Sequence, residues 1–272
     1  MGKYEVAGHE PSLLPEGSWE MVWADEFDGT ALDASKWDYR LSMMGQRWPS
    51  WTDKGVHLDG ESHAVFTLIE EDGKPVCSQL QTGYNFMDQP TVPTKFGHDA
   101  LQWHIGKLRE SKYLHSYGYY ECRCRMQQRP DAWWSAFWIQ SPVIGASPDP
   151  ADTGVEIDVM EYFGPGAVST HNVFTGGYGL DMTRSHAGGK TIGDLQDFHR
   201  FGLLWDETGY TFYVDGEENG KVTDKLTARP EFILISTEVL GYRREAHAPV
   251  PAAFDALGDT FLVDYVRVFD KK

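Results

Sequence analysis

Three acidic side chains lie within six residues of one strand-like segment. Glu156, Asp158 and Glu161 occur in Glu156-Ile-Asp-Val-Met-Glu161, whose other residues favour extended structure. Side chains alternate between the two faces of a strand, so Glu156 and Asp158 share one face. Glu161 lies at an odd offset from Glu156 and joins them only if a β-bulge near Val159 or Met160 inserts one extra residue. The sequence therefore predicts a bulged strand with three carboxylates on one face.

Crowded carboxylates cannot all ionise at neutral pH, so one keeps its proton while a partner stays anionic. Retaining glycoside hydrolysis requires a carboxylate in each of these two states. We predict that Glu156 is the nucleophile, that Glu161 is the general acid/base, and that Asp158 holds and relays the proton. The motif taken alone leaves two alternatives open, a solvated acidic strand face and a divalent-metal site.

Short segments rich in β-branched and aromatic residues recur between turn signals along the chain, with almost no 3.6-residue periodicity. This pattern predicts an all-β fold, a sandwich of antiparallel strands. The dipeptide Asp215-Gly216 after one such segment indicates a hairpin turn. The predicted strands are 19–23, 64–69, 79–84, 101–108, 117–127, 136–140, 156–162, 168–174, 198–205, 210–214, 231–238 and 261–269.

Residues 43–60, 85–99 and 178–194 are too polar and irregular to predict as strands. Long loops on a rigid sandwich usually shape a binding surface, so we expect them to wall a groove. Residues 1–18 are predicted to be an irregular lead-in. No linker, charge block or repeat divides the remainder, which predicts one catalytic domain over 19–272.

Composition limits the ligands and the location. The chain has 272 residues, a formal net charge of −17 and 14% aromatic residues. This charge argues against nucleic acid and favours a neutral ligand. No apolar run could cross a bilayer, and the N-terminus lacks an apolar signal segment. We expect a secreted, periplasmic or cell-surface protein whose leader is absent from this sequence, with the cytoplasm left open. The cysteines Cys77, Cys122 and Cys124 are predicted to be reduced packing residues.

From Trp19 to Asp270 the sequence resembles glycoside hydrolase family 16, the jelly-roll hydrolases that include laminarinases, β-agarases and porphyranases. The acidic box is the bulged form of that family's pattern. The resemblance implies two antiparallel sheets with a concave substrate groove, and the same three acid roles with retention of configuration. Its other motifs occur in the family's order: Trp23-Ala-Asp-Glu-Phe27, Lys36-Trp37, Tyr117-Gly-Tyr-Tyr-Glu-Cys-Arg123, Trp134-Ser-Ala-Phe-Trp138, Trp205, Tyr213-Val-Asp-Gly216 and Asp264-Tyr-Val-Arg-Val268.

The resemblance also implies roles outside the acidic box. Trp134 and Trp138 are expected on the groove face near the scissile bond, and His171 is expected to point towards the sugar. Asp264 matches an acid that binds a structural calcium ion in some members, while catalysis is expected to need no cofactor. Core packing is the alternative for the tryptophans, and a structural role is the alternative for His171. Further candidate sugar platforms are Trp48, Trp51, Trp103 and Trp133.

The expected activity is endo-cleavage of internal β-1,3 or β-1,4 linkages in a polysaccharide, by a monomeric enzyme. The substrate is expected to be a β-glucan such as laminarin or a red-algal galactan such as agarose or porphyran. Ser135 after Trp134, and Val159-Met160 within the box, look closer to some galactan-cleaving members, and Val155 stands where many glucan-cleaving members have glycine. A non-catalytic carbohydrate-binding module and a transglycosylase are the alternatives.

Overall fold

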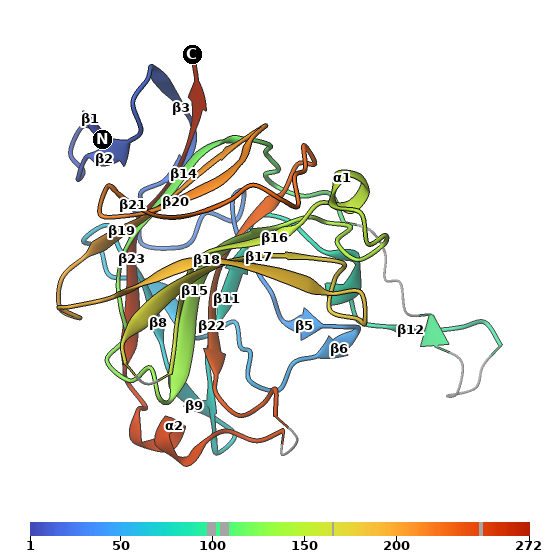
Figure 1. The fold of residues 1–272 in the computed structure, drawn as a ribbon. Helices are drawn as coiled ribbons and strands as arrows, with labels where there is room; N and C mark the ends of the chain where they lie inside the picture. Colours follow the sequence, from blue (N-terminus) through green and yellow to red (C-terminus); the bar gives the residue numbers. More distant parts are fainter. Residues whose placement is uncertain (97–101, 104–108, 165, 245–246) are drawn as a thin grey trace.

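Two antiparallel sheets stack face to face in the computed structural model, which describes residues 1–96, 102–103, 109–164, 166–244 and 247–272 (Figure 1). We call them the front sheet and the back sheet. The front sheet has the order β18 (Thr183–Thr191), β17 (Val168–Thr175), β16 (Glu156–Tyr162), β15 (Trp133–Gln140), β22 (Phe232–Val239), β11 (Gln79–Gln81) and β4 (Asp38–Tyr39).

Along the sequence, groups of back-sheet strands alternate with groups of front-sheet strands. The order of the back sheet is β21 (Glu217–Val222), β20 (Gly209–Val214), β19 (His199–Asp206), β14 (Gly118–Arg125), β23 (Thr260–Lys271), β8 (Ala64–Thr67) and β7 (Val56–Leu58), with β3 (Trp19–Asp25) also paired to β23. This interleaving is the jelly-roll sandwich expected from the sequence.

Short elements complete the described part of the chain. The paired strands are β1 (Gly2–Tyr4) with β2 (Ser12–Leu14), β5 (Ser42–Met43) with β6 (Gln46–Arg47), β9 (Ile69–Glu71) with β10 (Lys74–Val76), and β12 (Val92–Pro93) with β13 (Gln102–Trp103). The helices are the 3₁₀ turn η1 (Phe86–Asp88), α1 (Pro150–Thr153) and α2 (Pro251–Asp255). None of the described helices is long and apolar enough to cross a membrane.

The core lies between the two sheets and follows the alternation of the strands. Ile157 and Val159 of β16 point inward, together with Phe137 and Ile235 of the neighbouring strands, and all four are fully buried. Residues from the back sheet such as Leu203 complete the same cluster. Because the inward residues are apolar, the polar residues between them are directed to the outer face of the front sheet.

Several local predictions are confirmed. Strand β16 covers the predicted segment. The turn after β20 has Asp215 and Gly216 at φ values of 52° and 81°, and Val214 pairs with Glu217 across it. Both residues are in the left-handed region that such a two-residue hairpin requires. The cysteines are free and buried.

The prediction of loop structure over 178–194 is wrong for Thr183–Thr191, where β18 forms. This strand lies at the edge of the front sheet and pairs with β17. Its side chains are half-buried or exposed, so the strand is held by backbone hydrogen bonds to β17. Such a strand does not need the apolar alternation that would reveal it in the sequence. Residues 43–60 and 85–99 also contain short strands. The predicted strand 101–108 lies outside the described residues except for β13.

The segment 1–18 is not wholly irregular. Strand β1 pairs with β2, and the backbone N–H of Leu13 donates to Glu121 on the back sheet at 3.1 Å. Arg267 Nη1 donates to the carbonyl of Glu10 at 2.8 Å. These contacts dock the N-terminal segment on the outer face of the back sheet, which the polar composition of the segment did not indicate.

Candidate active site

A β-bulge on β16 brings the acidic residues to one face, as the sequence predicted. On the β15 side, Met160 pairs with Phe137 and Asp158 with Trp138, so Val159 faces no residue. On the β17 side, Asp158 pairs with Asn172 and Glu161 with Thr170. Val159 and Met160 both enter the core, while Asp158 and Glu161 both line the same cavity.

His171 supports this bulge from behind instead of pointing towards a sugar, so the expectation for this residue is wrong. Its side chain is fully buried and stacks on Phe212 of the back sheet with ring centroids 5.0 Å apart. Its Nδ1 donates to the carbonyl of Val159 at 2.6 Å, and its other ring nitrogen contacts the amide of Asn219 at 2.9 Å. Because the bulge removes Val159 from the regular ladder, this histidine satisfies an acceptor that would otherwise be buried without a partner.

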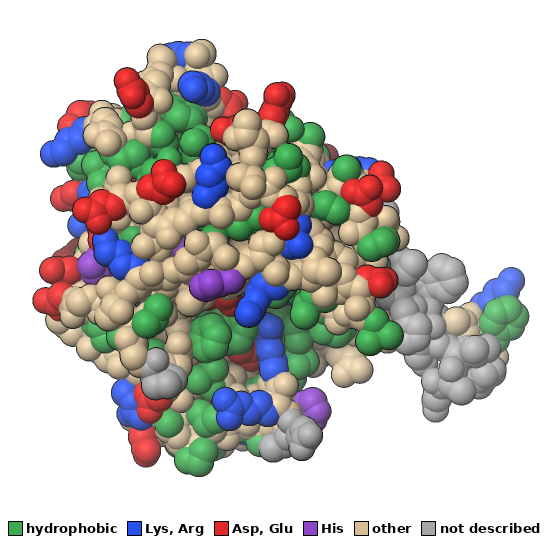
Figure 2. Space-filling view, viewed as in Figure 1, with side chains coloured by type: hydrophobic (Ala, Val, Ile, Leu, Met, Phe, Trp, Pro, Cys, Tyr) green, Lys and Arg blue, Asp and Glu red, His purple; other side chains and the backbone are tan. Residues whose placement is uncertain are grey.

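A cavity of about 190 Å³ opens on the outer face of the front sheet. Figure 2 shows this face with a hollow in which hydrophobic, acidic and basic side chains meet. Its lining combines acids, aromatic rings and one arginine, which suits a ligand with polar edges and apolar faces. The lining residues are Gln79, Trp134, Ala136, Trp138, Glu156, Asp158, Glu161, Phe174, Tyr178, Met182, Ser236, Glu238 and Arg243.

Glu156 lies at one end of the acidic row and is buried. Burial raises the pKa of its carboxyl group, and hydrogen bonds from Tyr178 and Gln140 together with the charge of Arg40 oppose that rise. Gln140 Nε2 donates to Oε2 at 2.6 Å, and the Tyr178 hydroxyl donates to the same oxygen. Hydrogen bonds to the anion favour the ionised form, which is the form that a nucleophile needs.

Asp158 and Glu161 share a hydrogen bond at the other end of the row. Burial and the neighbouring charges of Glu161 and Glu156 raise the pKa of Asp158 well above its usual value. Burial also raises the pKa of Glu161, and the hydrogen bonds from Asp158 and Asn172 oppose this. Asn172 Nδ2 donates to Glu161 Oε2 at 2.8 Å. These shifts favour a proton on Asp158 that is directed towards Glu161, an arrangement that suits a proton relay.

Two of the predicted tryptophans line the cavity. Trp134 stacks on Phe163 with centroids 4.8 Å apart, and the guanidinium of Arg243 lies 4.7 Å from its ring. Trp138 donates from Nε1 to Ser236 at 2.8 Å and lies 5.2 Å from the guanidinium of Arg40. Both rings flank the acids on β16, as expected for residues four positions apart on a regular strand.

The other tryptophans have different surroundings. Trp51 and Trp133 are buried, with exposed fractions of 2% and 0%, and both belong to the core cluster. The prediction that they form sugar platforms is therefore wrong, because neither ring is accessible. Trp48 is half-buried and packs against Trp51 outside the cavity lining. Trp103 lies on β13, but its side chain is outside the described part of the structure.

Glu238 was missed by sequence reasoning although it reaches the cavity from β22. Its buried carboxylate accepts hydrogen bonds from Trp48 Nε1 at 3.1 Å, Ser50 Oγ at 2.6 Å and Trp51 Nε1 at 3.0 Å. It also lies 3.4 Å from Arg243. Glu238 thus ties the segment before β7 to the cavity wall. The alternation of β22 places it on the face of Ser236, which was the available signal.

Gln140 and Tyr178 were also missed at this site, where Arg40 adds a buried positive charge. Arg40 is buried and pairs with Asp88 at 2.9 Å, and its charge acts on Glu156. These residues come from β15, from the segment after β4 and from the loop after β17. No sequence motif joins them, because only the fold brings these segments together.

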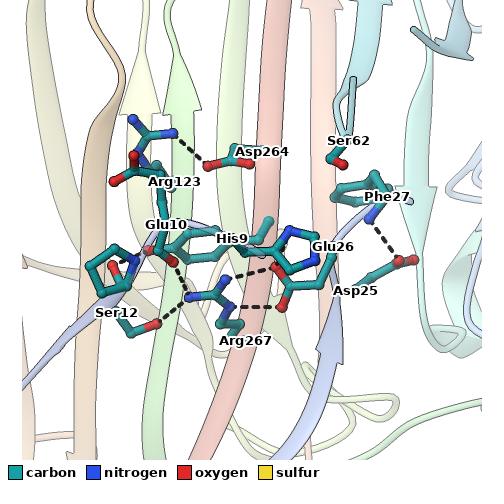
Figure 3. A network of polar contacts seen from close by, with 12 residues as sticks. His9, Glu10, Ser12, Asp25, Glu26, Phe27, Ser62, Arg123, Asp264 and Arg267 are labelled. Atoms are coloured by element: carbon teal, nitrogen blue, oxygen red, sulfur yellow. Dashed lines mark hydrogen bonds and ion pairs between the residues drawn. The ribbon is translucent and has the colours of Figure 1, made fainter. Parts of the chain in front are cut away.

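Asp264 lies on the outer face of the back sheet, away from the acids, and its carboxylate pairs with Arg123 at 2.5 Å (Figure 3). The nearby Glu26 is held by Arg267 through two hydrogen bonds of 2.8 Å and 2.7 Å. Calcium needs six or more oxygen ligands. These residues do not fit a calcium site, because guanidinium groups already neutralise both carboxylates and would repel a divalent cation.

Another group of possible metal ligands exists among the described residues. Asp59, Glu61 and His63 have ligand atoms within 4.8 Å of one another. Asp59 already accepts from His63 at 2.7 Å and from the backbone of Glu61 at 2.8 Å. The group is mostly exposed and far from β16 in the fold, so it takes no part in the chemistry of the cavity.

A two-sheet jelly roll with a bulged row of acids at the floor of an aromatic cavity defines a glycoside hydrolase. The model of the glycosyl hydrolases family 16 matches residues 50–236, more than half of the chain. The chain belongs to this family.

Individual relatives agree with this placement. The chain is 29% identical to glucan endo-1,3-beta-glucosidase A1 of Niallia circulans over 93% of its own length but spans 38% of that protein. It is 26% identical to beta-porphyranase B of Phocaeicola plebeius, covering 98% of this chain and 90% of that protein. The crystal structure of a laminarinase from Flavobacterium sp. UMI-01 has a TM-score of 0.65 at 20% identity, with 92% and 100% of the two chains covered, and so shares the fold.

Proposed function

We propose that this protein is an endo-acting, retaining glycoside hydrolase that cleaves internal β-1,3 or β-1,4 linkages of a polysaccharide. The observation that carries the proposal is the bulge at Val159, which sets Glu156, Asp158 and Glu161 side by side in one cavity. A row of acids with one proton held by Asp158 supplies both the anion and the acid that double displacement requires.

The proposed reaction has two steps. In the first, Glu156 attacks the anomeric carbon while the proton held by Asp158 passes to Glu161 and from there to the glycosidic oxygen, and the bond to the leaving sugar breaks. In the second, Glu161 takes a proton from water, and the water oxygen displaces Glu156 from the covalent intermediate. Asp158 shares its hydrogen bond with Glu161 through both steps and adjusts where the proton resides.

The aromatic walls support a carbohydrate ligand. Trp134 and Trp138 present ring faces beside the acids, and sugar rings stack on such faces through their C–H groups. All the proposed catalytic groups come from one chain, which supports action as a monomer. A polymer substrate is too large to enter an intact cell, which supports a secreted or cell-surface location.

The named relatives support both a β-glucan and a galactan as substrate class. A β-glucan is our first candidate, since the relatives that match more than nine-tenths of this chain include an endo-1,3-beta-glucosidase and a beta-glucanase against one porphyranase. One observation favours a galactan with anionic groups as the second candidate. Arg243 lies over Trp134 at the cavity, where a guanidinium could bind a sulfate ester.

The test is parallel digestion of laminarin, mixed-linkage glucan, agarose and porphyran, followed by a reducing-sugar assay and size analysis of the products. We expect new reducing ends and oligosaccharides of mixed length from at least one polymer. Proton NMR during early turnover should show the β-anomer first, because double displacement retains configuration.

Four outcomes would contradict parts of the proposal. An α-anomer as first product would exclude the retaining mechanism. Polymer binding without new reducing ends would make the protein a carbohydrate-binding module, and products longer than the supplied oligosaccharide would make it a transglycosylase. Release of single sugars from chain ends alone would exclude endo-cleavage.

A further inference from the structure

The loop between β17 and β18 returns Tyr178 to the acidic strand. The Tyr178 hydroxyl donates to Oε2 of Glu156, and Gln140 Nε2 reaches both groups, at 2.6 Å from Oε2 and 2.7 Å from the tyrosine oxygen. Tyr178 and Gln140 come from different segments of the chain. Both hydrogen bonds nevertheless end on the same carboxylate oxygen.

The backbone of this loop is held in place by two close approaches. Gly176 and Gly177 have φ values of 79° and 66°, a conformation that favours glycine. A Cβ atom on Gly177 would lie 2.9 Å from the Cα of Gly145, and one on Gly176 would lie 2.3 Å from the carbonyl oxygen of Asp181. The loop therefore turns tightly against the segment that follows β15, and this contact fixes the backbone position of Tyr178.

The two oxygens of Glu156 consequently differ. Oε2 accepts both hydrogen bonds, whereas Oε1 accepts none from the residues that the structure describes. A carboxylate that attacks a carbon atom uses one oxygen to form the new bond and keeps the other as the carbonyl oxygen of the resulting ester. The donors occupy one oxygen and leave the other available to the cavity.

We propose that Tyr178 is a positioning residue that fixes the carboxylate of Glu156 so that Oε1 attacks the anomeric carbon. This inference rests on the proposed role of Glu156 as nucleophile. In the first step the Oε1–carbon bond forms as the glycosidic bond breaks, and the proton from Glu161 goes to the leaving oxygen. The hydroxyl of Tyr178 stays on Oε2 throughout and keeps the free enzyme's carboxylate ionised.

The charged and titratable groups around Glu156 come from every neighbouring element. Asp158 and Glu161 share its strand, Arg40 follows β4 and pairs with Asp88, Glu231 precedes β22, and Arg243 follows β22. None of these surrounding groups hydrogen-bonds to the Tyr178 hydroxyl in the described structure. Removal of that hydroxyl therefore acts first on Glu156.

The test is Tyr178→Phe, assayed on whichever polymer of the panel gives the highest rate. A hydrogen bond to a charged group contributes enough that its loss should lower kcat by roughly tenfold or more and move the acidic limb of kcat/KM up by about one pH unit, with little change in KM. Replacement of Tyr178 by 3-fluorotyrosine keeps the donor and should retain the wild-type kcat and acidic limb.

Tyr213→Phe is the matched control. This tyrosine lies on β20 of the back sheet, half-buried against Tyr119 with ring centroids 6.0 Å apart, and loses the same single oxygen. It should change neither limb of the pH profile. Thermal unfolding of all variants checks that folding is intact, and removal of one hydroxyl from a half-buried loop residue should leave the melting temperature of Tyr178→Phe near wild type.

An unmoved acidic limb in Tyr178→Phe would overturn the inference, as would a rise in KM with unchanged kcat, which would make the ring a sugar contact only. Glu156→Gln separates this failure from failure of the proposed function. If Glu156→Gln is inactive while Tyr178→Phe is indistinguishable from wild type, only the positioning role is lost. If Glu156→Gln retains full activity, the nucleophile itself is wrongly assigned.

Discussion

On the front sheet, Glu156, Asp158 and Glu161 stand together in one cavity, whereas on the back sheet Glu26 and Asp264 each face a guanidinium. The cations nearest the front acids hydrogen-bond elsewhere, Arg40 to Asp88 and Arg243 to Glu238. Burial raises the pKa of all three front carboxyl groups, and repulsion from neighbouring acids adds to the rise for Asp158 and Glu161. Figure 3 shows the opposite arrangement, with Glu26 pointing at Arg267 and Asp264 at Arg123.

The comparison teaches how the same residue types take different roles. Paired buried charges lock segments together, and their loss leaves an uncompensated charge. Unpaired buried carboxylates cost stability but remain available to exchange protons near neutral pH. The front sheet is therefore expected to govern turnover, and the back sheet is expected to govern unfolding.

The largest expected effect is a difference in kcat between substitutions of two buried glutamates. Glu156 faces the cavity, while Glu121 on β14 is fully buried and accepts from the Tyr265 hydroxyl at 2.7 Å. Glu156→Gln should lower kcat by about 10⁴-fold or more with the fold intact, because the nucleophile is gone. Glu121→Gln should leave kcat unchanged. Reducing-sugar assays with circular dichroism test the pair, and an active Glu156→Gln enzyme would contradict the comparison.

Removal of the central cation on the back sheet should have the next largest effect. Arg267 is fully buried and holds Glu26, Ser12 and the carbonyl of Glu10. Arg267→Met should lower the free energy of unfolding by about 3–5 kcal/mol, because Glu26 loses its guanidinium partner and is left with the more distant His9, 3.6 Å away. Urea unfolding measures this loss. Specific activity of the folded fraction should match wild type, and a large drop in kcat would show that the two faces are coupled.

Substitution of Asp158 is expected to raise the stability at neutral pH, a smaller effect of opposite sign to that of Arg267→Met. The folded pKa of Asp158 is raised above the unfolded value, so its contribution to stability is largest at low pH and is lost as the pH rises through the folded pKa. Asp158→Asn should therefore be more stable than wild type at pH 7, by about 1–2 kcal/mol, with the difference shrinking towards about pH 4. Its kcat should fall by about 10–100-fold, because the relay to Glu161 is broken.

Thermal melts across this pH range measure the Asp158→Asn difference. Asp264→Asn is the contrasting variant, since it breaks the pair with Arg123 and should be less stable than wild type at pH 7. If both variants shift stability in the same direction, the proposed contrast between the sheets fails.

The smallest expected effect concerns calcium. Because Arg123 already neutralises Asp264, addition of EDTA or of millimolar CaCl₂ should leave the melting temperature and kcat unchanged. Arg123→Met frees the carboxylate and is the sensitising variant. A calcium-dependent rise in the wild-type melting temperature would show that the guanidinium does not replace the ion.

Much of the fold could be predicted from local patterns. The two-residue alternation of Glu156–Tyr162 predicted both the strand and the need for a bulge, since only an inserted residue puts Glu161 on the face of Glu156. The edge strand β18 could not be predicted in this way, because backbone pairing to β17 holds it and its side chains carry no apolar signal.

The site was predicted less completely than the fold. Trp134 and Trp138 line the cavity as expected. Trp51 and Trp133 are residues of the same type but are buried away from the cavity, and His171 is also buried. Residue type alone does not tell whether a side chain points into the cavity or into the core when a loop packs against it. For His171, the carbonyl freed by the bulge decided the outcome.

The sequence by itself determined the acidic row, the hairpin at Asp215-Gly216 and the apolar alternation that makes two sheets, because each depends on neighbours within a few residues. Only the tertiary structure decided that Tyr178 and Gln140 meet on one oxygen of Glu156, and that Arg123 meets Asp264. Those contacts join segments far apart in the chain, and their geometry is fixed by how the sheets and loops pack, which no local pattern encodes.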